Sequence, residues 1–225
     1  TIDIARDLSN SLVRVAKGAG LNCEAILTDM NQVLGKSAGH TLEILECIKY
    51  IKNDFKDHRL EKITNELISS LLVNIYKISK EEAYNKINTV INNGLAAEKF
   101  EMMVAALGGP KNILTSYEKD LTNTSIQKDI FSIEGGWIEN IHTRELGLIL
   151  IELGGGRKQV TDKINYGVGY DNVLNIGDEV NSSTPLLSLY SSKNIDDNLI
   201  NKIKGCFIIS DKKTQKLSEI FETIN

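Results

Sequence analysis

Between residues 22 and 51 the chain changes from a short apolar run to a glycine-containing loop and then to an amphipathic helix. Residues 22–27 (NCEAIL) are typical of a short β-strand. After the loop, Leu42, Leu45 and Ile48 recur at helical spacing, which predicts a helix with a buried face. Open α/β sheets bind ligands at the carboxyl ends of their strands, so residues 28–46 (TDMNQVLGKSAGHTLEILE) are a candidate site. An ordinary strand-to-helix connection is the alternative.

Composition narrows the class of protein. The 225 residues carry a net charge of −4, with 41% hydrophobic and 25% charged residues, as in an ordinary globular protein. This balance predicts no nucleic-acid partner and no anionic-membrane partner. The three widely spaced cysteines favour a reducing compartment, and no signal peptide or long apolar run is present, so we expect a cytoplasmic protein. Since the chain begins with Thr1, we expect a portion of a longer protein.

The first half of the chain is predicted to be mostly helical. Thr1 can cap a helix with apolar residues at Ile4, Leu8, Leu12 and Val15. The glycines at 18 and 20 are interpreted as the end of this helix rather than as a phosphate loop, because helix carboxyl ends repel anions. Further helices are predicted at residues 60–78, 80–93, 94–107 and 110–121.

Two histidines are candidates for a site residue. His58 lies in a charged stretch, residues 57–59, and is interpreted as a solvated surface residue. His40 follows the glycine at position 39, where a helix-terminus role and a site role both remain open.

After residues 123–125 the pattern changes to short β-strands. We predict strands at residues 130–133, 137–141, 165–168, around 180 and at 186–190, with one helix at 143–153. The predicted fold class is therefore α/β plus α+β, divided into residues 1–121, a linker at 122–128, and a smaller domain at 129–225.

Two further stretches have a recognisable pattern. Residues 176–180 and 185–189 resemble the hairpin of biotinyl and lipoyl carrier domains, which are barrel-sandwich hybrids. No lysine occupies a Met-Lys-Met turn, so a cofactor-carrying swinging arm is not expected. Residues 153–158 (LGGGRK) could meet an anion or form a flexible connector.

Several motifs together resemble the thymidine and pyrimidine-nucleoside phosphorylase family. They are VAKGAG at 15–20, TDMNQVLG at 28–35, GHTLE at 39–43, MMVAA at 102–106, LGGGR at 153–157, DKI at 162–164 and GVG at 167–169. The resemblance implies the C-terminal half of such an enzyme. Residues 1–121 would end its α/β phosphate-binding domain, and residues 129–225 would form its barrel-sandwich-hybrid-like C-terminal domain.

The resemblance also implies a reaction. The complete enzymes are pentosyltransferases that split thymidine and related pyrimidine deoxyribonucleosides reversibly into free base and 2-deoxyribose 1-phosphate, with phosphate as co-substrate. They are homodimers and use no organic cofactor. Their phosphate loop and catalytic lysine segment are absent here, so we expect no catalytic residue in this chain and no activity without an N-terminal half, on the same or another polypeptide. The alternative is a non-catalytic remnant or accessory binding protein.

Five residues match family positions with a role in the site. Leu34 and Ser37, through backbone oxygens, and Glu46 would hold a potassium-like ion, although a capped helix with a surface glutamate is the alternative. Leu12 would edge the base pocket or lie in the core. Arg157, in the loop at 154–161, would help close the substrate cleft.

Overall fold

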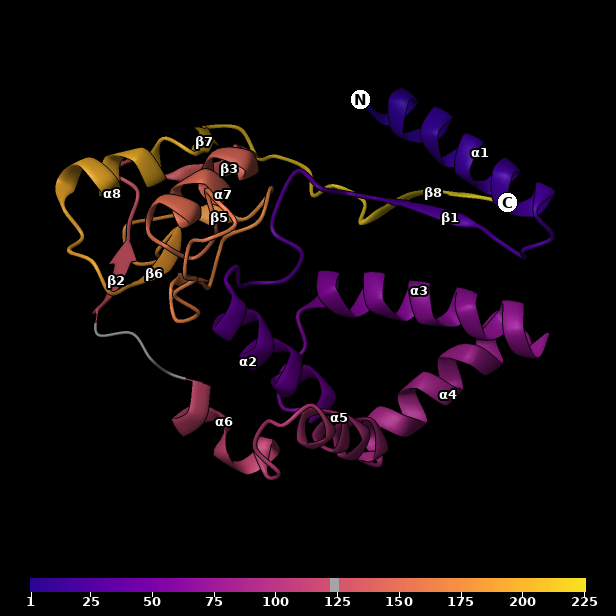
Figure 1. The fold of residues 1–225 in the computed structure, drawn as a ribbon. Coiled ribbons are helices and arrows are strands. Elements are labelled where there is room, and N and C mark those ends of the chain that lie inside the picture. The colour runs from indigo at the N-terminus through magenta and orange to yellow at the C-terminus, as the bar shows by residue number, and fades with distance from the viewer. Residues whose placement is uncertain (122–125) are drawn as a thin grey trace.

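The computed structural model describes residues 1–121 and 126–225, and its elements are shown in Figure 1. The helical part comprises α1 (Ile2–Gly18), β1 (Ala25–Thr28), α2 (His40–Ile51), α3 (His58–Tyr76), α4 (Lys80–Asn92), α5 (Leu95–Ala106) and α6 (Ile113–Leu121). The strand-rich part comprises β2 (Ile126–Ile130), β3 (Gly136–Ile141), α7 (Thr143–Glu152), β4 (Gly169–Asp171), β5 (Glu179–Val180), β6 (Leu187–Ser191), α8 (Asp197–Lys204), β7 (Phe207–Ser210) and β8 (Ile220–Ile224). The predicted mixture of a helical part and a strand-containing part is confirmed.

Helix starts follow local capping chemistry. Asp57 caps α3 by accepting hydrogen bonds from the backbone N–H groups of Arg59 and Leu60. Ser79 caps α4 in the same way, since its hydroxyl oxygen accepts a hydrogen bond from the backbone N–H of Glu82. Helix α6 begins at Ile113 rather than at the predicted residue 110.

The strand-rich part contains two antiparallel sheets of three strands, ordered β2-β6-β4 and β5-β3-β7. Their inner faces and α7 share one hydrophobic core that includes Ile138, Leu146, Tyr170 and Leu189. The Tyr170 hydroxyl donates a hydrogen bond to the Leu146 carbonyl oxygen, so the polar end of this buried ring is satisfied.

The last strand returns to the beginning of the chain. β8 pairs antiparallel with β1 as a separate sheet of two strands, and in Figure 1 these strands run between α1 and α3. Ion pairs link β8 and its preceding residue to both helices: Arg6 of α1 with Glu222, and Lys62 of α3 with Glu219. The strand from residues 22–27 is thus confirmed in shorter form, with a partner that was not predicted.

Two strand predictions were wrong, and two strands and one helix were not predicted. The strand expected at 130–133 lies at 126–130, so Ile133 is 89% exposed. Residues 165–168 form a turn, in which the Asn165 side chain accepts a hydrogen bond from the Gly167 N–H, and β4 follows it. Helix α8 and strands β7 and β8 were not predicted. Within the predicted linker, residues 122–125 lie outside the described residues, and 126–128 belong to β2.

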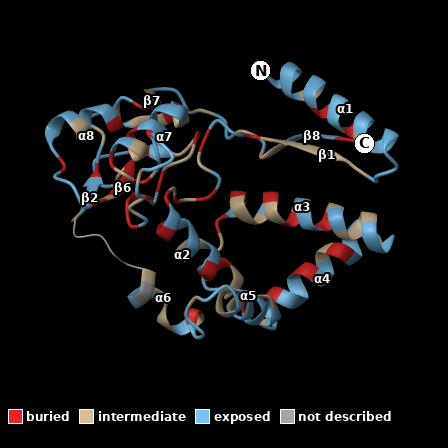
Figure 2. Ribbon diagram, viewed as in Figure 1, coloured by how far each residue is buried: buried red, intermediate tan, exposed pale blue. Residues whose placement is uncertain are grey.

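Burial differs between the two parts, as Figure 2 shows. Buried residues gather in the strand-rich part, whereas α1 is exposed along most of its length. Among the described residues, no helix has the length and apolar character that a bilayer-spanning helix needs.

Candidate functional site

The loop between β1 and α2 is organised by the buried carboxylate of Asp29. This side chain accepts hydrogen bonds from the Asn31 backbone N–H at 2.9 Å, the Asn31 side-chain amide at 2.6 Å and the Gln32 side-chain amide at 2.7 Å. A carboxylate that accepts several hydrogen bonds can remain charged inside a protein. Asp29 therefore holds the turn that follows the strand.

Arg59, the second residue of α3, completes this arrangement. Its Nη1 atom lies 2.9 Å from Asp29 Oδ2, its Nη2 atom donates to the Asp29 carbonyl oxygen, and its Nε atom donates to the Val33 carbonyl oxygen at 3.1 Å. The two charged side chains are 5% and 0% exposed. The interpretation of His58 as a solvated surface residue is confirmed, since its side chain is 80% exposed, whereas the burial of its neighbour Arg59 was not foreseen.

Glu46 closes the second half of the loop from α2. Its Oε1 atom accepts the Lys36 N–H at 2.8 Å, and its Oε2 atom accepts the Ser37 N–H at 3.2 Å and the Ser37 hydroxyl at 2.5 Å. A Cβ atom at Gly35 would overlap this carboxylate, so the close approach requires glycine. Glu46 is half-buried and contacts Ser37 through the N–H and hydroxyl donors of Ser37, and the potassium-like ion at Leu34, Ser37 and Glu46 stays a prediction.

The same loop is joined to the strand-rich part by backbone hydrogen bonds. Ala38 and Tyr170 exchange two, at 2.9 and 2.7 Å, and the Val173 N–H donates to the Lys36 carbonyl oxygen at 3.0 Å. Gly39 and Gly169 sit at this crossing, where a Cβ on either would lie 2.6 Å from a backbone oxygen of the other segment. The loop therefore forms one connection between the two parts of the chain, and the pairing of β1 with β8 forms another.

Side chains reinforce the connection. The Gln32 amide oxygen accepts the Ile176 N–H at 2.9 Å. Asp178 lies 2.9 Å from Lys216 Nζ and 3.5 Å from Lys36 Nζ. Burial alone would raise the pKa of Asp178, but hydrogen bonds from Lys216 and the Asn175 N–H, together with the charge of Lys36, lower it below its usual value.

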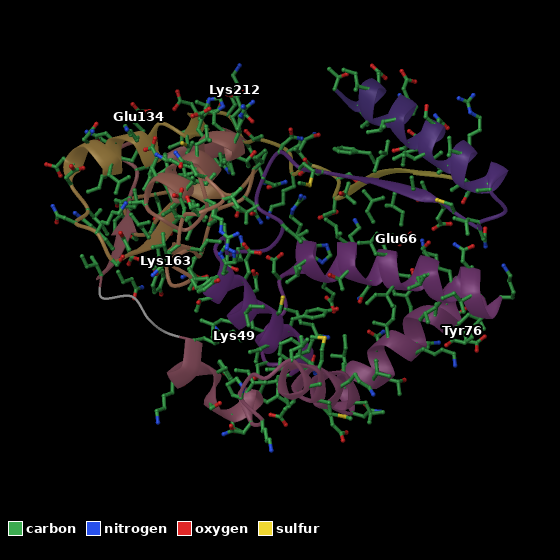
Figure 3. The ribbon with its side chains drawn as sticks, viewed as in Figure 1. Lys49, Glu66, Tyr76, Glu134, Lys163 and Lys212 are labelled. Atoms are coloured by element: carbon green, nitrogen blue, oxygen red, sulfur yellow. The ribbon has the colours of Figure 1, made fainter. Side chains whose placement is uncertain are left out.

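Two cavities flank α2. One of about 380 Å³ is lined by apolar side chains of α2 together with Glu46, Lys49, Tyr117 and Asp171. The other, of about 570 Å³, lies at the start of α2 and is lined by Thr41, Lys163 and Tyr166. Figure 3 shows Lys49 on α2 and Lys163 on the strand-rich side of this junction. Mixed charges line the first cavity, and among the described residues no cluster of three or more His, Cys, Asp or Glu could bind a metal.

The remaining predicted site residues lie apart from this loop. Arg157 is exposed in the turn after α7, where Asp162 accepts the N–H groups of Lys158 and Gln159 at 2.9 Å. Leu12 lies on α1, which packs on β1 and β8, and it is 60% exposed, so the alternative of a core residue is wrong within this chain. His40 begins α2 and its ring contacts Tyr166 edge to face, with centroids 5.3 Å apart.

Four residues that organise this loop and its contacts were not identified as site residues from the sequence: Asp29, Gln32, Arg59 and Asp178. One signal was available: Asp29 directly follows an apolar strand, where a buried carboxylate needs a cationic partner. Its partner lies 30 residues away along the chain, so spacing could not reveal it.

Comparison with known proteins identifies the family. Residues 137–210 match the model of the pyrimidine nucleoside phosphorylase C-terminal domain. A thymidine phosphorylase from Colwellia psychrerythraea is 40% identical over 191 residues, which are 84% of this chain and 44% of that relative. The chain belongs to the pyrimidine-nucleoside phosphorylase family. It spans less than half the length of this phosphorylase relative and corresponds to a C-terminal part, as the sequence resemblance predicted.

The domain of the phosphorylase family covers only part of the structure described above. The matched residues run from β3 to β7 and include the turn with Arg157 and the connection at Tyr170. Asp29, Arg59 and Glu46 precede the matched domain, so the loop they organise joins the phosphorylase C-terminal domain to the helical part.

Proposed function

We propose that this chain supplies the C-terminal part of a thymidine phosphorylase. The complete enzyme would convert thymidine or a related pyrimidine deoxyribonucleoside and phosphate reversibly into free base and 2-deoxyribose 1-phosphate. The observation that carries this proposal is the 40% identity to a thymidine phosphorylase over 84% of the chain. The reaction would make it a glycosyltransferase of the pentosyltransferase type, acting in pyrimidine salvage and catabolism in the cytoplasm.

The finer fold assignment belongs to the same proposal. Residues 1–121 would be the end of an α/β phosphate-binding domain, which the sheet of β1 and β8 between α1 and α3 supports. Residues 129–225 would be a barrel-sandwich-hybrid-like domain, which two antiparallel sheets around one core support. A homodimer is expected for the complete enzyme.

Within such an enzyme this chain would shape and close the site rather than perform the chemistry. Phosphorolysis depends on positioning the phosphate and on stabilising charge on the departing base. Leu12 would edge the base pocket, and Arg157, with its exposed guanidinium after the glycines at 154–156, would help to close the cleft. The groups that grip phosphate would come from an N-terminal half, on the same or another polypeptide.

A potassium-like ion at the Glu46 loop is also proposed. The backbone oxygens of Leu34 and Ser37 and the carboxylate of Glu46 would form an oxygen-only donor set, which suits a hard cation. Glu46 already accepts three hydrogen bonds from the loop, so its oxygens have little remaining capacity in this chain alone. A bound cation would offset the negative charge of Glu46. We therefore expect the melting temperature of the assembled enzyme to be higher in potassium chloride than in sodium chloride.

The direct test is phosphate-dependent release of thymine from thymidine. We expect none from this chain alone and measurable turnover when it is co-expressed with the part of the Colwellia enzyme that it does not match. Turnover by the isolated chain would contradict the assignment of phosphate binding to the other half. Absence of turnover in a folded, assembled pair would favour a non-catalytic accessory protein, the alternative consistent with a chain that spans 44% of its relative.

A further inference from the structure

The cavity of about 380 Å³ that flanks α2, called here the α2 cavity, lies between segments that are far apart in the chain. Its walls come from α2, the residues that follow it, α6 and the end of β4. Helix α2 packs against both α6 and β4, so the fold itself fixes these walls. The volume falls within the range of small-molecule sites, about 300–1,000 Å³. Neither Leu12 nor Arg157 lines this cavity.

Apolar and aromatic side chains form part of the lining. Leu42 and Leu45 of α2 contribute an apolar wall, and Leu42 is buried. Phe55, in the segment between α2 and α3, is half-exposed, and Tyr117 of α6 contributes a second aromatic ring. An aromatic ring that stays half-exposed beside a cavity offers a face on which a flat ring can stack. This lining therefore favours a flat ligand.

Some polar groups of the lining have hydrogen-bonding capacity left. Among the described residues, the ammonium group of Lys49, which Figure 3 labels, has no hydrogen bond or ion pair, and the side-chain amide of Asn172 has no partner. The Asp171 carboxylate accepts the Asn172 N–H at 2.8 Å through Oδ1, which leaves Oδ2 available. Donors and an acceptor of this kind can orient a ligand that itself carries both donors and acceptors.

The charges around the cavity disfavour one class of ligand. Carboxylates outnumber ammonium groups in the lining, with Glu46, Asp54 and Asp171 against Lys36 and Lys49. A phosphate or carboxylate group in this cavity would therefore meet net repulsion, whereas an uncharged ligand would not. The available donors and the available acceptor then decide how an uncharged ring is oriented.

We propose that the α2 cavity binds an uncharged pyrimidine base. The ring would stack on Phe55, a ring carbonyl oxygen would accept a hydrogen bond from Lys49, and a ring N–H would donate to Asp171 Oδ2. A base bound there contacts α2 and the strand-rich part together, so it would strengthen the connection between the two parts of the chain. The choice of a pyrimidine among flat rings with amide groups rests on the proposed function, whereas the cavity and its available polar groups are properties of the described structure.

The test is a titration of the 225-residue chain with thymine, followed by ligand-detected NMR and hydrogen exchange. We expect a dissociation constant of about 1 mM or lower, as ligand efficiencies allow for so small a molecule, and slower amide exchange at residues 42–55 and 171–172. Lys49→Met and Phe55→Ala should each weaken binding by about fivefold or more, because each removes one contact of the base. Lys99→Met is the matched control, since Lys99 is exposed on α5 and does not line the cavity.

Each outcome bears on the proposal. Lys49 and Phe55 are exposed, so both variants should keep the melting temperature of the unmodified chain, which separates loss of binding from loss of folding. Absence of thymine binding, or equal binding by both variants and the control, would overturn the site. Tighter binding of thymidine monophosphate than of thymine would contradict the charge argument and assign the cavity to an anion. Equal binding of adenine would overturn the choice of a pyrimidine.

The site and the proposed function can fail separately. Thymine binding at the α2 cavity without phosphorolysis by the assembled enzyme would leave the site standing and overturn the proposed function. Phosphorolysis by an assembled enzyme whose α2 cavity binds no thymine would overturn the site alone.

Discussion

The strand-rich part and the helical part of this chain differ in how completely they are buried. One cluster of eighteen buried apolar residues fills the strand-rich part, with Ile138, Leu187 and Leu189 at 0% exposure. Among the described residues of the helical part, the corresponding cluster has three buried members, Tyr50, Ile87 and Ile91, and the other buried apolar side chains of this part lie outside it. Since burial of apolar surface is the main favourable contribution to folding, the two parts should differ in stability.

Polar contacts offset the smaller apolar cluster of the helical part at a few positions. The Tyr50 hydroxyl donates to Asn65 at 3.0 Å and joins α2 to α3, while burial, followed by the charge of Glu61, raises the pKa of Tyr50 to about 12. The Asp29–Arg59 pair joins the loop to α3. The stability of the helical part therefore depends on a few specific contacts, whereas the stability of the strand-rich part depends on a packed apolar core.

The largest expected effect is at the buried ion pair. Arg59→Met should lower the free energy of unfolding of the helical part by about 3–5 kcal/mol, because it leaves Asp29 buried without its cation. Urea unfolding with hydrogen exchange resolved by segment would measure it. Arg14→Met, at an exposed arginine of α1, should be nearly neutral. Equal effects of the two changes would show that the pair does not hold the loop.

The next prediction compares the cost of truncating a core leucine of the strand-rich part with that of truncating an exposed leucine of the helical part. Leu189→Ala should cost about 2–4 kcal/mol, because it leaves a cavity in the strand-rich core. Leu12→Ala should change the free energy of unfolding of the isolated chain by less than about 0.5 kcal/mol, since Leu12 is 60% exposed. Urea unfolding of both variants would test the contrast. A large cost for Leu12→Ala would mean that α1 is buried in solution, for example by self-association.

Local signals in the sequence predicted the helices well. The positions of α3, α4 and α5 followed from the spacing of apolar residues. The hydrogen bonds from Lys36 and Ser37 to Glu46 were not predicted, because ten residues separate Lys36 from Glu46 and spacing alone allows many arrangements; the family resemblance led only to the expectation of a shared ion.

Long-range partners could not be predicted. β8 exists because β1 lies beside it, although about 190 residues separate them in the chain. The strand at residues 169–171 begins after a turn fixed by Asn165 and by the crossing of Gly39 with Gly169, which no local pattern reveals. The ion pair of Arg59 depends on the same kind of tertiary contact.

A smaller effect tests the Glu46 loop. Glu46→Gln should cost about 1–2 kcal/mol, because an amide nitrogen cannot accept the hydrogen bonds that Lys36 and Ser37 donate to the two carboxylate oxygens. Hydrogen exchange at residues 36 and 37 should increase locally. Glu139→Gln, at an exposed position of β3, removes the same charge without such contacts and should be neutral. Equal exchange at residues 36 and 37 in both variants would contradict the role of Glu46.

The smallest effect concerns Asp178, which pairs with Lys216 inside the strand-rich part and with Lys36 of the loop between β1 and α2. Asp178 has a folded-state pKa below its usual value, so its contribution to stability is fully present above about pH 4 and is lost as the pH falls through the folded pKa. Because Lys216 is 72% exposed, solvent screening limits this contribution to below about 1 kcal/mol. Asp178→Asn should therefore reduce the loss of stability between pH 5 and about pH 2, measured by urea unfolding at each pH. Lys216→Met should reduce it partly, whereas Lys213→Met, at an exposed neighbouring lysine, should leave it unchanged. If Lys216→Met and Lys213→Met behaved alike, the pKa of Asp178 would be lowered by Lys36 of the loop and by the Asn175 N–H, and the pair with Lys216 would contribute nothing measurable.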